Sequence, residues 1–378
     1  MLMKNNITLD ITKPAPLYHI VKGKILELIR QNVLKDGDRL PPEEEIAKEN
    51  KISIGTVRTA LLELAREGII TRYTKRGSFV TLKKSSNSVK IGIISPFPSL
   101  TKEGADFYRT ELWGGIQEGF VNTGATLLFS RNELKNGKKA GVVFKERVDG
   151  LLFLVPLRTQ ENLMEELKEK GLPLMVAGAT PKNGLNFVGV DNQKGVEAAV
   201  GYLAKMGHAK VGAVFSGIEH FDGFWRYQGY LSSLEKFSLP LRKNWVKIIR
   251  QTEPKTWTEE AARLTKEILN DTPRPTVILA GGGFVALGVK EGIEETGLKI
   301  PEDVSLISFD DFHLAQYLVP PLTTIAQPIW QMGELAIKKL VEIIKNETAQ
   351  PCQIILKPEL MIRDSVRNLK KTKPGVRA

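Results

Sequence analysis

Beyond residue 88 the sequence alternates between short apolar runs and stretches long enough for helices. Seven apolar runs of three to six residues lie between Ile91 and Phe309. Continuous apolar strands between helices indicate parallel sheets that are buried on both faces. The pattern therefore predicts an α/β fold with two doubly wound lobes. Ligands of such sheets bind at the carboxyl ends of the strands, and between two lobes they bind in the cleft.

The first 84 residues have a different pattern. Apolar residues at a spacing of three to four predict an amphipathic helix over 17–33. Pro41-Pro42 begins a second helix, and a third extends from its N-cap Ser53 to Gly68. Strands are expected over 69–73 and 78–82, on either side of the turn at 75–77. This is the pattern of a winged helix-turn-helix.

A winged helix-turn-helix places its third helix in the major groove of DNA. Ser53, Thr56 and Arg58 lie near the start of that helix, and Arg can bind guanine or a phosphate. Lys75 and Arg76 at the wing turn suit phosphate or minor-groove contact. Each charge alone would be read as solvated surface, but the complete pattern favours DNA binding.

Charge and cysteine usage agree with this interpretation. Residues 1–84 carry 16 Lys/Arg against 10 Asp/Glu, whereas residues 85–362 carry 32 of each. A basic small domain beside a neutral large one indicates a polyanion partner for the first. Cys352 is the single cysteine, and neither a secretory signal nor a membrane-spanning run is present, so we expect a cytoplasmic protein. The basic residues 369–378 are interpreted as a solvated tail in preference to a binding arm.

The sequence shows no motif of a catalytic site, cofactor or metal. The four histidines are far apart and lack ligand spacing. Gly281-Gly282-Gly283 precedes a helix, but no Lys-Ser/Thr follows as in a phosphate-binding P-loop. We therefore expect no enzyme, no cofactor and no metal site.

Residues 16–82 resemble the winged-helix domain of the GntR family of bacterial transcription regulators. The resemblance rests on Pro16-Leu17-Tyr18, Leu40-Pro41, Glu43, Glu45, Thr56-Val57-Arg58, Ala60-Leu61, Leu64, Gly68-Ile69 and Gly77-Ser78-Phe79-Val80. It implies DNA contacts from Glu43 or Glu44, from Ile54 to Thr56, from Arg58, and from Arg76-Gly77. The chain departs from the family at Ile54, where Arg is common, so that an apolar contact replaces a polar one or a contact is missing.

Residues 89–364 resemble the periplasmic-binding-protein-like effector domain of LacI-family repressors. The resemblance rests on Val148-Asp149-Gly150-Leu151, Val190-Asp191-Asn192, Met206-Gly207-His208, Arg226-Tyr227-Gln228-Gly229-Tyr230, Asp303-Val304-Ser305-Leu306-Ile307, Phe309-Asp310-Asp311 and Pro321-Leu322-Thr323-Thr324-Ile325. A GntR-type reader joined to a LacI-type sensor resembles the architecture of arabinose repressors. The LacI-type hinge helix has no counterpart here.

The two resemblances imply domain boundaries. The expected parts are a winged helix-turn-helix domain over 1–83, a linker over 84–88, and a two-lobed effector-binding and dimerisation domain over 89–368. Lobe one is expected at about 89–192 and 322–347, and lobe two at about 193–320 and 350–364.

The second resemblance also implies an effector site in the cleft between the lobes. Its expected residues are Phe97, Tyr108, Arg131, Asp191, Phe221, Trp225, Arg226, Gly283 and Asp310. Arg226 falls on the effector-binding arginine of the family motif. Two positions that bear pocket carboxylates in the family fall at Gly178 and at Gly282-Gly283 in this chain. The effector is then a sugar or sugar phosphate, another metabolite, or none at all.

These observations predict a DNA-binding transcriptional regulator, a repressor that a small-molecule effector releases from its operator. It would act as a homodimer on a two-fold symmetric site of double-stranded DNA, away from any membrane. The alternatives are a regulator with a degenerate pocket that binds no effector, a solute-binding protein, and an enzyme fusion.

Overall fold

The computed structural model describes residues 7, 9, 16–31, 33–73, 76–81, 89–95, 107–121, 123–129, 147–182, 184–250, 256–347 and 351–370. The chain divides into two compact units, Met1–Ser88 and Val89–Ala378. The expected linker over 84–88, the site residues Lys75, Phe97 and Arg131, and residues 371–378 of the expected tail lie outside the described residues.

The first unit is a three-helix domain with a two-stranded wing. Its elements are α1 (Leu17–Arg30), α2 (Glu43–Glu49), α3 (Ile54–Arg66), β1 (Ile70–Tyr73) and β2 (Gly77–Val80). Ser53 caps α3, since its side chain accepts a hydrogen bond from the backbone N–H of Thr56 at 3.0 Å. Gly68, with φ of 72°, supplies the left-handed conformation after α3. β1 and β2 pair antiparallel, with Tyr73 opposite Gly77.

The apolar stripes of the three helices meet in one core. Its largest members are fully buried: Ile25, Leu34, Leu40, Ile46, Leu61 and Leu64. Val57, Ala60, Leu61 and Leu64 form the inward face of α3 at helical spacing. The opposite face, which carries Arg58, is thereby left to solvent.

The second unit contains two six-stranded sheets with helices on both faces. The first has the order β13-β7-β6-β5-β3-β4, and all its described pairs are parallel. Its strands are β3 (Lys90–Ile94), β4 (Thr126–Phe129), β5 (Gly150–Leu154), β6 (Leu174–Ala177), β7 (Phe187–Val190) and β13 (Gln353–Leu356). We call this sheet and its helices lobe one.

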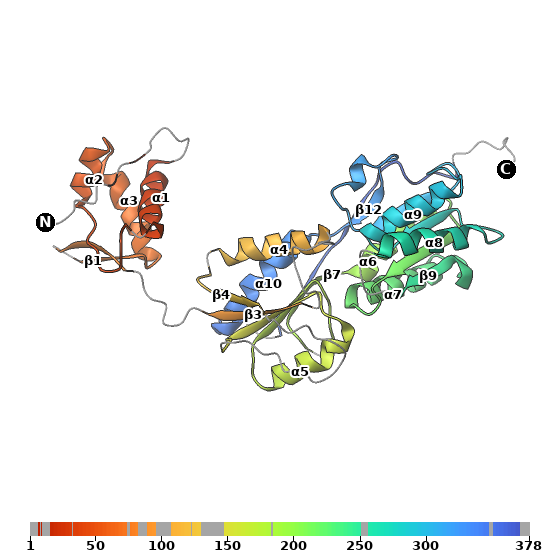
Figure 1. Cartoon of the computed structure of the whole chain (residues 1–378), viewed down its shortest axis with the longest axis horizontal. Coiled ribbons are helices and arrows are strands. Elements are labelled where there is room, and N and C mark those ends of the chain that lie inside the picture. Colours follow the sequence, from red (N-terminus) through yellow and green to blue (C-terminus); the bar gives the residue numbers. More distant parts are fainter. Residues whose placement is uncertain are drawn as a thin grey trace. The chain divides into compact units, whose positions relative to one another are not determined.

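Alternate residues of the lobe one strands enter two separate cores. Leu152 and Leu154 pack with α4 (Phe107–Phe120) and α10 (Ile329–Ile344), which lie side by side (Figure 1). Leu151 and Phe153 face the other side, toward α5 (Glu161–Glu169), which follows the 3₁₀ turn η1 (Arg158–Gln160). The central strands β3, β5, β6 and β7 are thus buried on both faces, as their continuous apolar sequence predicts, whereas the edge strands β4 and β13 are partly exposed.

Lobe two has the sheet order β14-β12-β11-β10-β8-β9, in which only β14 pairs antiparallel among the described strands. Its strands are β8 (Val211–Ser216), β9 (Val246–Ile249), β10 (Val277–Ala280), β11 (Ser305–Phe309), β12 (Thr323–Ala326) and β14 (Glu359–Met361). Helices α6 (Asn192–Lys205) and α7 (Phe221–Lys236) cover one face, and α8 (Trp257–Leu269) and α9 (Gly283–Glu295) the other. The 3₁₀ turn η2 (Lys243–Trp245) lies between α7 and β9, and η4 (Ala315–Tyr317) lies between β11 and β12.

The sheet order corrects the expected lobe boundaries. β12 lies within 322–347, which was expected in lobe one, yet it pairs with β11 in lobe two, where Ile307 lies opposite Thr323. β13 lies within 350–364, expected in lobe two, but it pairs with β7 in lobe one. The chain therefore crosses between the lobes after β12, not before it, and crosses again between β13 and β14.

Candidate functional site

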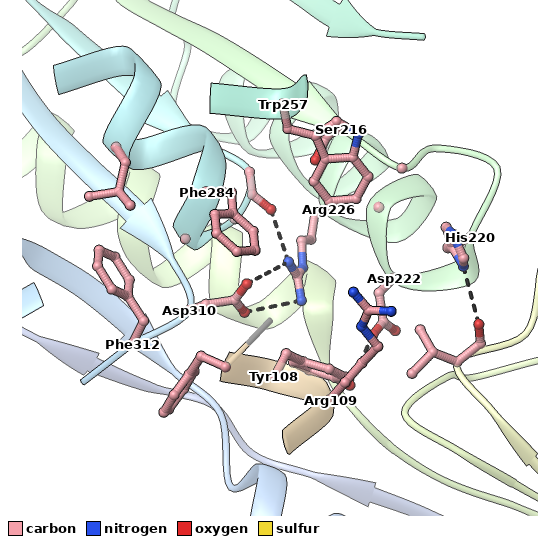
Figure 2. Close-up of a pocket in the computed structure, with 18 of the residues that line it drawn as sticks. Tyr108, Arg109, Ser216, His220, Asp222, Arg226, Trp257, Phe284, Asp310 and Phe312 are labelled. Atoms are coloured by element: carbon pink, nitrogen blue, oxygen red, sulfur yellow. Dashed lines mark hydrogen bonds and ion pairs between the residues drawn. The ribbon is translucent and has the colours of Figure 1, made fainter. Parts of the chain in front are cut away.

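A cavity of about 270 Å³ lies between the two lobes of the second unit. The start of α4 and Val155 line it from lobe one, whereas α7, the start of α8, α9 and the loops after β8, β10 and β11 line it from lobe two. The lining residues include the rings of Phe107, Tyr108, Trp257, Phe284 and Phe312, and the ionisable residues Arg109, His220, Asp222, Arg226, Asp310 and His313. Figure 2 shows several of these rings around the Arg226 side chain.

Arg226 is buried and already has several partners. Its Nε donates to Oδ1 of Asn192 at 2.8 Å, and its Nη1 donates to the carbonyl oxygen of Gly281 at 2.9 Å. Its Nη1 and Nη2 lie 3.4 and 3.3 Å from the carboxylate oxygens of Asp310 (Figure 2). The guanidinium also stacks over Phe309, 4.0 Å from the ring centroid. The charge of Arg226 is therefore compensated within the protein.

Asp222 brings a second carboxylate into the cavity wall. Asn192 donates to its Oδ1 at 3.0 Å, and the Tyr108 hydroxyl of lobe one donates to its Oδ2 at 3.3 Å. Loss of solvation by burial raises the pKa of Asp222 from 3.8 to about 6, although the nearby Arg226 cation and the Asn192 hydrogen bond oppose that rise. The same loss of solvation raises the pKa of the Tyr108 hydroxyl.

The expected site residues of α7 divide between two faces of the helix. Asp222 and Arg226, four residues apart, face the cavity. Phe221 and Trp225 do not line the cavity: each lies one position earlier on the helix and packs against the lobe one core around Phe153. Trp225 also donates from Nε1 to the carbonyl oxygen of Thr180 at 3.3 Å. These two aromatic residues contact lobe one outside the cavity, which differs from their expected place in the effector site.

Asp191 also lies outside the cavity lining. Its side chain caps α6 by accepting a hydrogen bond from the backbone N–H of Lys194 at 2.9 Å. The next residue, Asn192, takes the position between Asp222 and Arg226. Of the expected effector residues, the structure brings together Tyr108, Arg226, Gly283 and Asp310 around the cavity.

The two carboxylate positions that are glycine in this chain lie close to the same network. A Cβ on Gly282 would lie 3.5 Å from Oδ2 of Asp310 and 3.9 Å from Nη1 of Arg226. A Cβ on Gly178 would lie 2.8 Å from the Tyr108 hydroxyl, which occupies that space instead. The acidic residues that line the cavity are Asp222 and Asp310.

The sequence analysis missed several cavity residues, among them Arg109, His220, Asp222, Trp257, Phe284 and Phe312. Phe284 and Phe312 follow the carboxyl ends of β10 and β11, so their position after a strand was a usable signal. Asp222 could have been found from its spacing of four to Arg226 on one helix. No sequence pattern marks Trp257.

Other polar residues have structural partners. Arg363 donates to both carboxylate oxygens of Asp311, at 2.7 and 3.0 Å. The ring nitrogens of His208 lie 2.9 Å from the Thr276 hydroxyl and 2.9 Å from the carbonyl oxygen of Arg367. No group of three or more potential metal ligands occurs within the described ranges. No helix there has the length and apolar character needed to span a membrane.

In the first unit, the expected DNA-contacting residues of α3 share its exposed N-terminal turn. Ile54 is 41% exposed, and the hydroxyls of Ser53 and Thr56 lie 2.8 Å apart. Arg58 is exposed one turn later. These residues therefore form one surface at the start of the third helix.

Glu43 at the start of α2 interacts with two arginines. Nε of Arg58 donates to its Oε2 at 2.9 Å, and Nη2 of Arg72 on β1 donates to its Oε1. Arg72 was not among the expected DNA-contacting residues. At the wing, Gly77 has φ of 99°, and the guanidinium of Arg76 lies 5.9 Å from the Tyr73 ring.

Both units match models of known families. Residues 17–80 match the model of the bacterial regulatory proteins of the gntR family. Residues 200–366 match the model of the periplasmic binding protein-like domain.

Two related proteins and a solved structure are similar to most of this chain. The arabinose metabolism transcriptional repressor of Geobacillus stearothermophilus is 27% identical over 94% of this chain and 99% of its own length. The HTH-type transcriptional repressor PurR of Yersinia pestis bv. Antiqua (strain Antiqua) is 27% identical over 85% of this chain and 96% of its own. The structure of the lac repressor dimer bound to operator and the anti-inducer ONPF has a TM-score of 0.64 at 20% identity, over 75% of this chain and 96% of that one. This last likeness is one of fold.

Proposed function

We propose that this chain, which joins a GntR-type DNA-binding domain to a periplasmic binding protein-like domain, is a transcriptional repressor that a small molecule releases from its operator. The observation that carries the proposal is the presence of two separate sites in one chain. An exposed, arginine-bearing start of α3 suits DNA, and an aromatic-walled cavity between the lobes suits a small ligand. The relatives are regulators, not enzymes, and so is this chain.

The DNA half of the proposal is tested by selection. The purified full-length chain is incubated with a library of random duplexes, and the retained duplexes are amplified and sequenced. We expect a two-fold symmetric consensus with half-sites about one helical turn apart, because homodimeric readers match such sites. A chain that retains no sequence in preference to another would refute the proposal.

A repressor acts on chromosomal DNA, so the proposed function also implies a cytoplasmic protein.

The second part of the proposal concerns the charge of the small-molecule effector. Arg226 is compensated by Asp310, and the remaining ionisable groups of the cavity include the cation Arg109 and the carboxyl Asp222. Burial lowers the pKa of His220, which favours its neutral form. The formal charges of the two arginines and two aspartates therefore cancel. A phosphate would also lie near the Asp222 carboxylate. We therefore propose an uncharged effector with an apolar ring face, such as a free sugar, over a sugar phosphate.

Matched ligand pairs test this choice. Thermal unfolding is measured with ribose and ribose 5-phosphate, arabinose and arabinose 5-phosphate, and glucose and glucose 6-phosphate. A ligand at a hundred times its Kd adds about 2.7 kcal/mol to the free energy of unfolding. We expect any stabilisation to come from the uncharged member of a pair. Stabilisation by the phosphate alone would refute an uncharged effector.

We infer that the ligand releases the protein from DNA by shifting the population of the second unit between open and closed arrangements of its lobes. A ligand in the cavity contacts both lobes and favours their closed arrangement, so it changes the operator affinity of a coupled dimer. The operator affinity of the chain, measured by gel shift with and without the stabilising ligand, should fall in its presence. Equal affinities would leave DNA binding intact but refute its control by the cavity.

A further inference from the structure

The two arginines that share Glu43 come from different elements of the first unit. Arg58 lies on α3 and Arg72 on the wing strand β1, and each donates to its own oxygen of the Glu43 carboxylate. We call these three residues the Glu43 cluster. Since one carboxylate touches both guanidinium groups, Arg72 must lie close to Arg58.

The three side chains of the Glu43 cluster differ in how far they are exposed to solvent. The Glu43 side chain is 13% exposed, whereas those of Arg58 and Arg72 are 57% and 32% exposed. Both carboxylate oxygens already accept a hydrogen bond from arginine. A carboxylate in this position is poorly placed to meet DNA itself, and the phosphates of DNA would repel it.

Arg58 keeps its terminal donors for DNA. Its contact with Glu43 uses Nε, and its two terminal nitrogens have no partner among the residues that the structure describes. These two nitrogens carry the donors for the bidentate contact with guanine or phosphate. Fixing one edge of a planar guanidinium limits the directions that its other donors can take.

We propose that Glu43 is a positioning residue that orients Arg58 toward the DNA, and that Arg72 is an additional phosphate contact beside it. This inference rests on the proposed DNA-binding function. It replaces the direct DNA contact that the family resemblance implies for Glu43. Glu44 provides a matched control, since it carries the same charge on the same helical turn but is exposed and has no partner among the described residues.

The test compares base preferences selected by variants of the full-length chain. Random-duplex selection is repeated with Arg58→Ala, Glu43→Gln, Glu43→Asp and Glu44→Gln, after circular dichroism has established that each is folded. We expect the Glu43 variants to reproduce the effect of Arg58→Ala in kind, with loss of preference at the same base pair or the same uniform weakening. The loss should be about 5- to 150-fold for a bidentate base contact. Glu43→Asp keeps the charge but shortens the side chain, so it separates positioning from charge.

Two outcomes would overturn the role of Glu43, and a third would overturn the function on which it rests. Loss of preference at a base pair that Arg58→Ala leaves intact would show a direct contact by Glu43. Equal behaviour of Glu43→Gln and Glu44→Gln, with Glu43→Asp like the wild type, would show an effect of charge alone. A wild-type chain that retains no duplex would overturn the DNA-binding function itself, and this failure is distinguished because it appears before any variant is made.

The role of Arg72 is tested by the salt dependence of binding. Arg72→Ala should reduce the slope of log K against log salt concentration by about one, because one phosphate contact is lost. Arg66, an exposed arginine at the end of α3 without a partner among the described residues, serves as the control. An unchanged slope for Arg72→Ala, or the same change for Arg66→Ala, would overturn this contact.

Discussion

Asp222→Asn should remove a pH dependence from the stability of the second unit. The Asp222 carboxyl lies in the cavity wall, where burial raises its pKa to about 6 from 3.8. The folded state therefore binds the proton more tightly than the unfolded chain does. The stabilising contribution of the protonated carboxyl is complete below pH 3.8 and is lost as the pH rises through about 6.

The size of this effect follows from the pKa difference. At about 1.4 kcal/mol per pH unit, the difference amounts to about 3 kcal/mol in the free energy of unfolding. About 2 kcal/mol of this falls between pH 4.5 and pH 7.5. Asn has a similar shape and does not ionise. The free energy of unfolding of the variant should therefore rise relative to that of the wild type by about this amount over the same range.

Urea unfolding followed by tryptophan fluorescence measures the effect without interference from the first unit. All five tryptophans lie at or beyond position 113, so the signal comes from the second unit alone. Unfolding is recorded for both proteins at half-unit steps from pH 4.5 to 7.5. A difference in unfolding free energy that stays constant across this range would refute the raised pKa. A fall in the unfolding free energy of the variant relative to that of the wild type as the pH rises would show that the fold stabilises the carboxylate and lowers its pKa.

Three further predictions concern packing and the cavity wall. Gly23→Ala should stabilise the first unit by about 1 kcal/mol, since Gly23 lies within α1 and a Cβ there meets nothing within 4 Å; unchanged thermal unfolding of this unit by calorimetry would contradict it. Gly115→Ala should destabilise the second unit, because its Cβ would overlap with the carbonyl oxygen of Trp330 where α4 crosses α10; a wild-type urea midpoint would show that the helices can separate without cost. Trp257→Ala should raise the Kd of the stabilising ligand about tenfold by calorimetric titration, while Trp330→Ala, outside the cavity, should not; equal effects would remove Trp257 from the ligand site.

In both lobes, strands alternate with helices along the chain. This alternation could be predicted because a strand that is buried on both faces requires a continuous apolar sequence. The sheets to which β12 and β13 belong could not be predicted, because both strands are four residues long and neither sequence selects one sheet over the other. Their pairing depends on where the chain crosses between lobes, and that is set by tertiary contacts. The lobe boundaries were accordingly wrong at this point.

The cavity shows the same limit at the level of side chains. Arg226 was singled out by its motif, but its pairing with Asp310 spans 84 positions of sequence. The family resemblance placed Phe221 and Trp225 in the effector site together with Arg226, which lies on the same helix. Helical geometry separates them, since a step of one residue rotates the side chain by about 100°. The sequence therefore identified the correct helix, but it did not separate the face that lines the cavity from the face that packs on lobe one.

The crossings between lobes constrain how the second unit can move. Within the described residues, the chain passes from one sheet to the other between β7 and α6, between β12 and α10, and between β13 and β14. The first and the third of these connections are hydrogen-bonded to each other, because the backbone N–H of Asp191 donates to the carbonyl oxygen of Leu356 at 3.0 Å. Three adjacent connections resist twisting and sliding far more than they resist bending. The lobes are thus left with one soft degree of freedom, a rotation that opens or narrows the cavity, and the size of the bound molecule would set its angle.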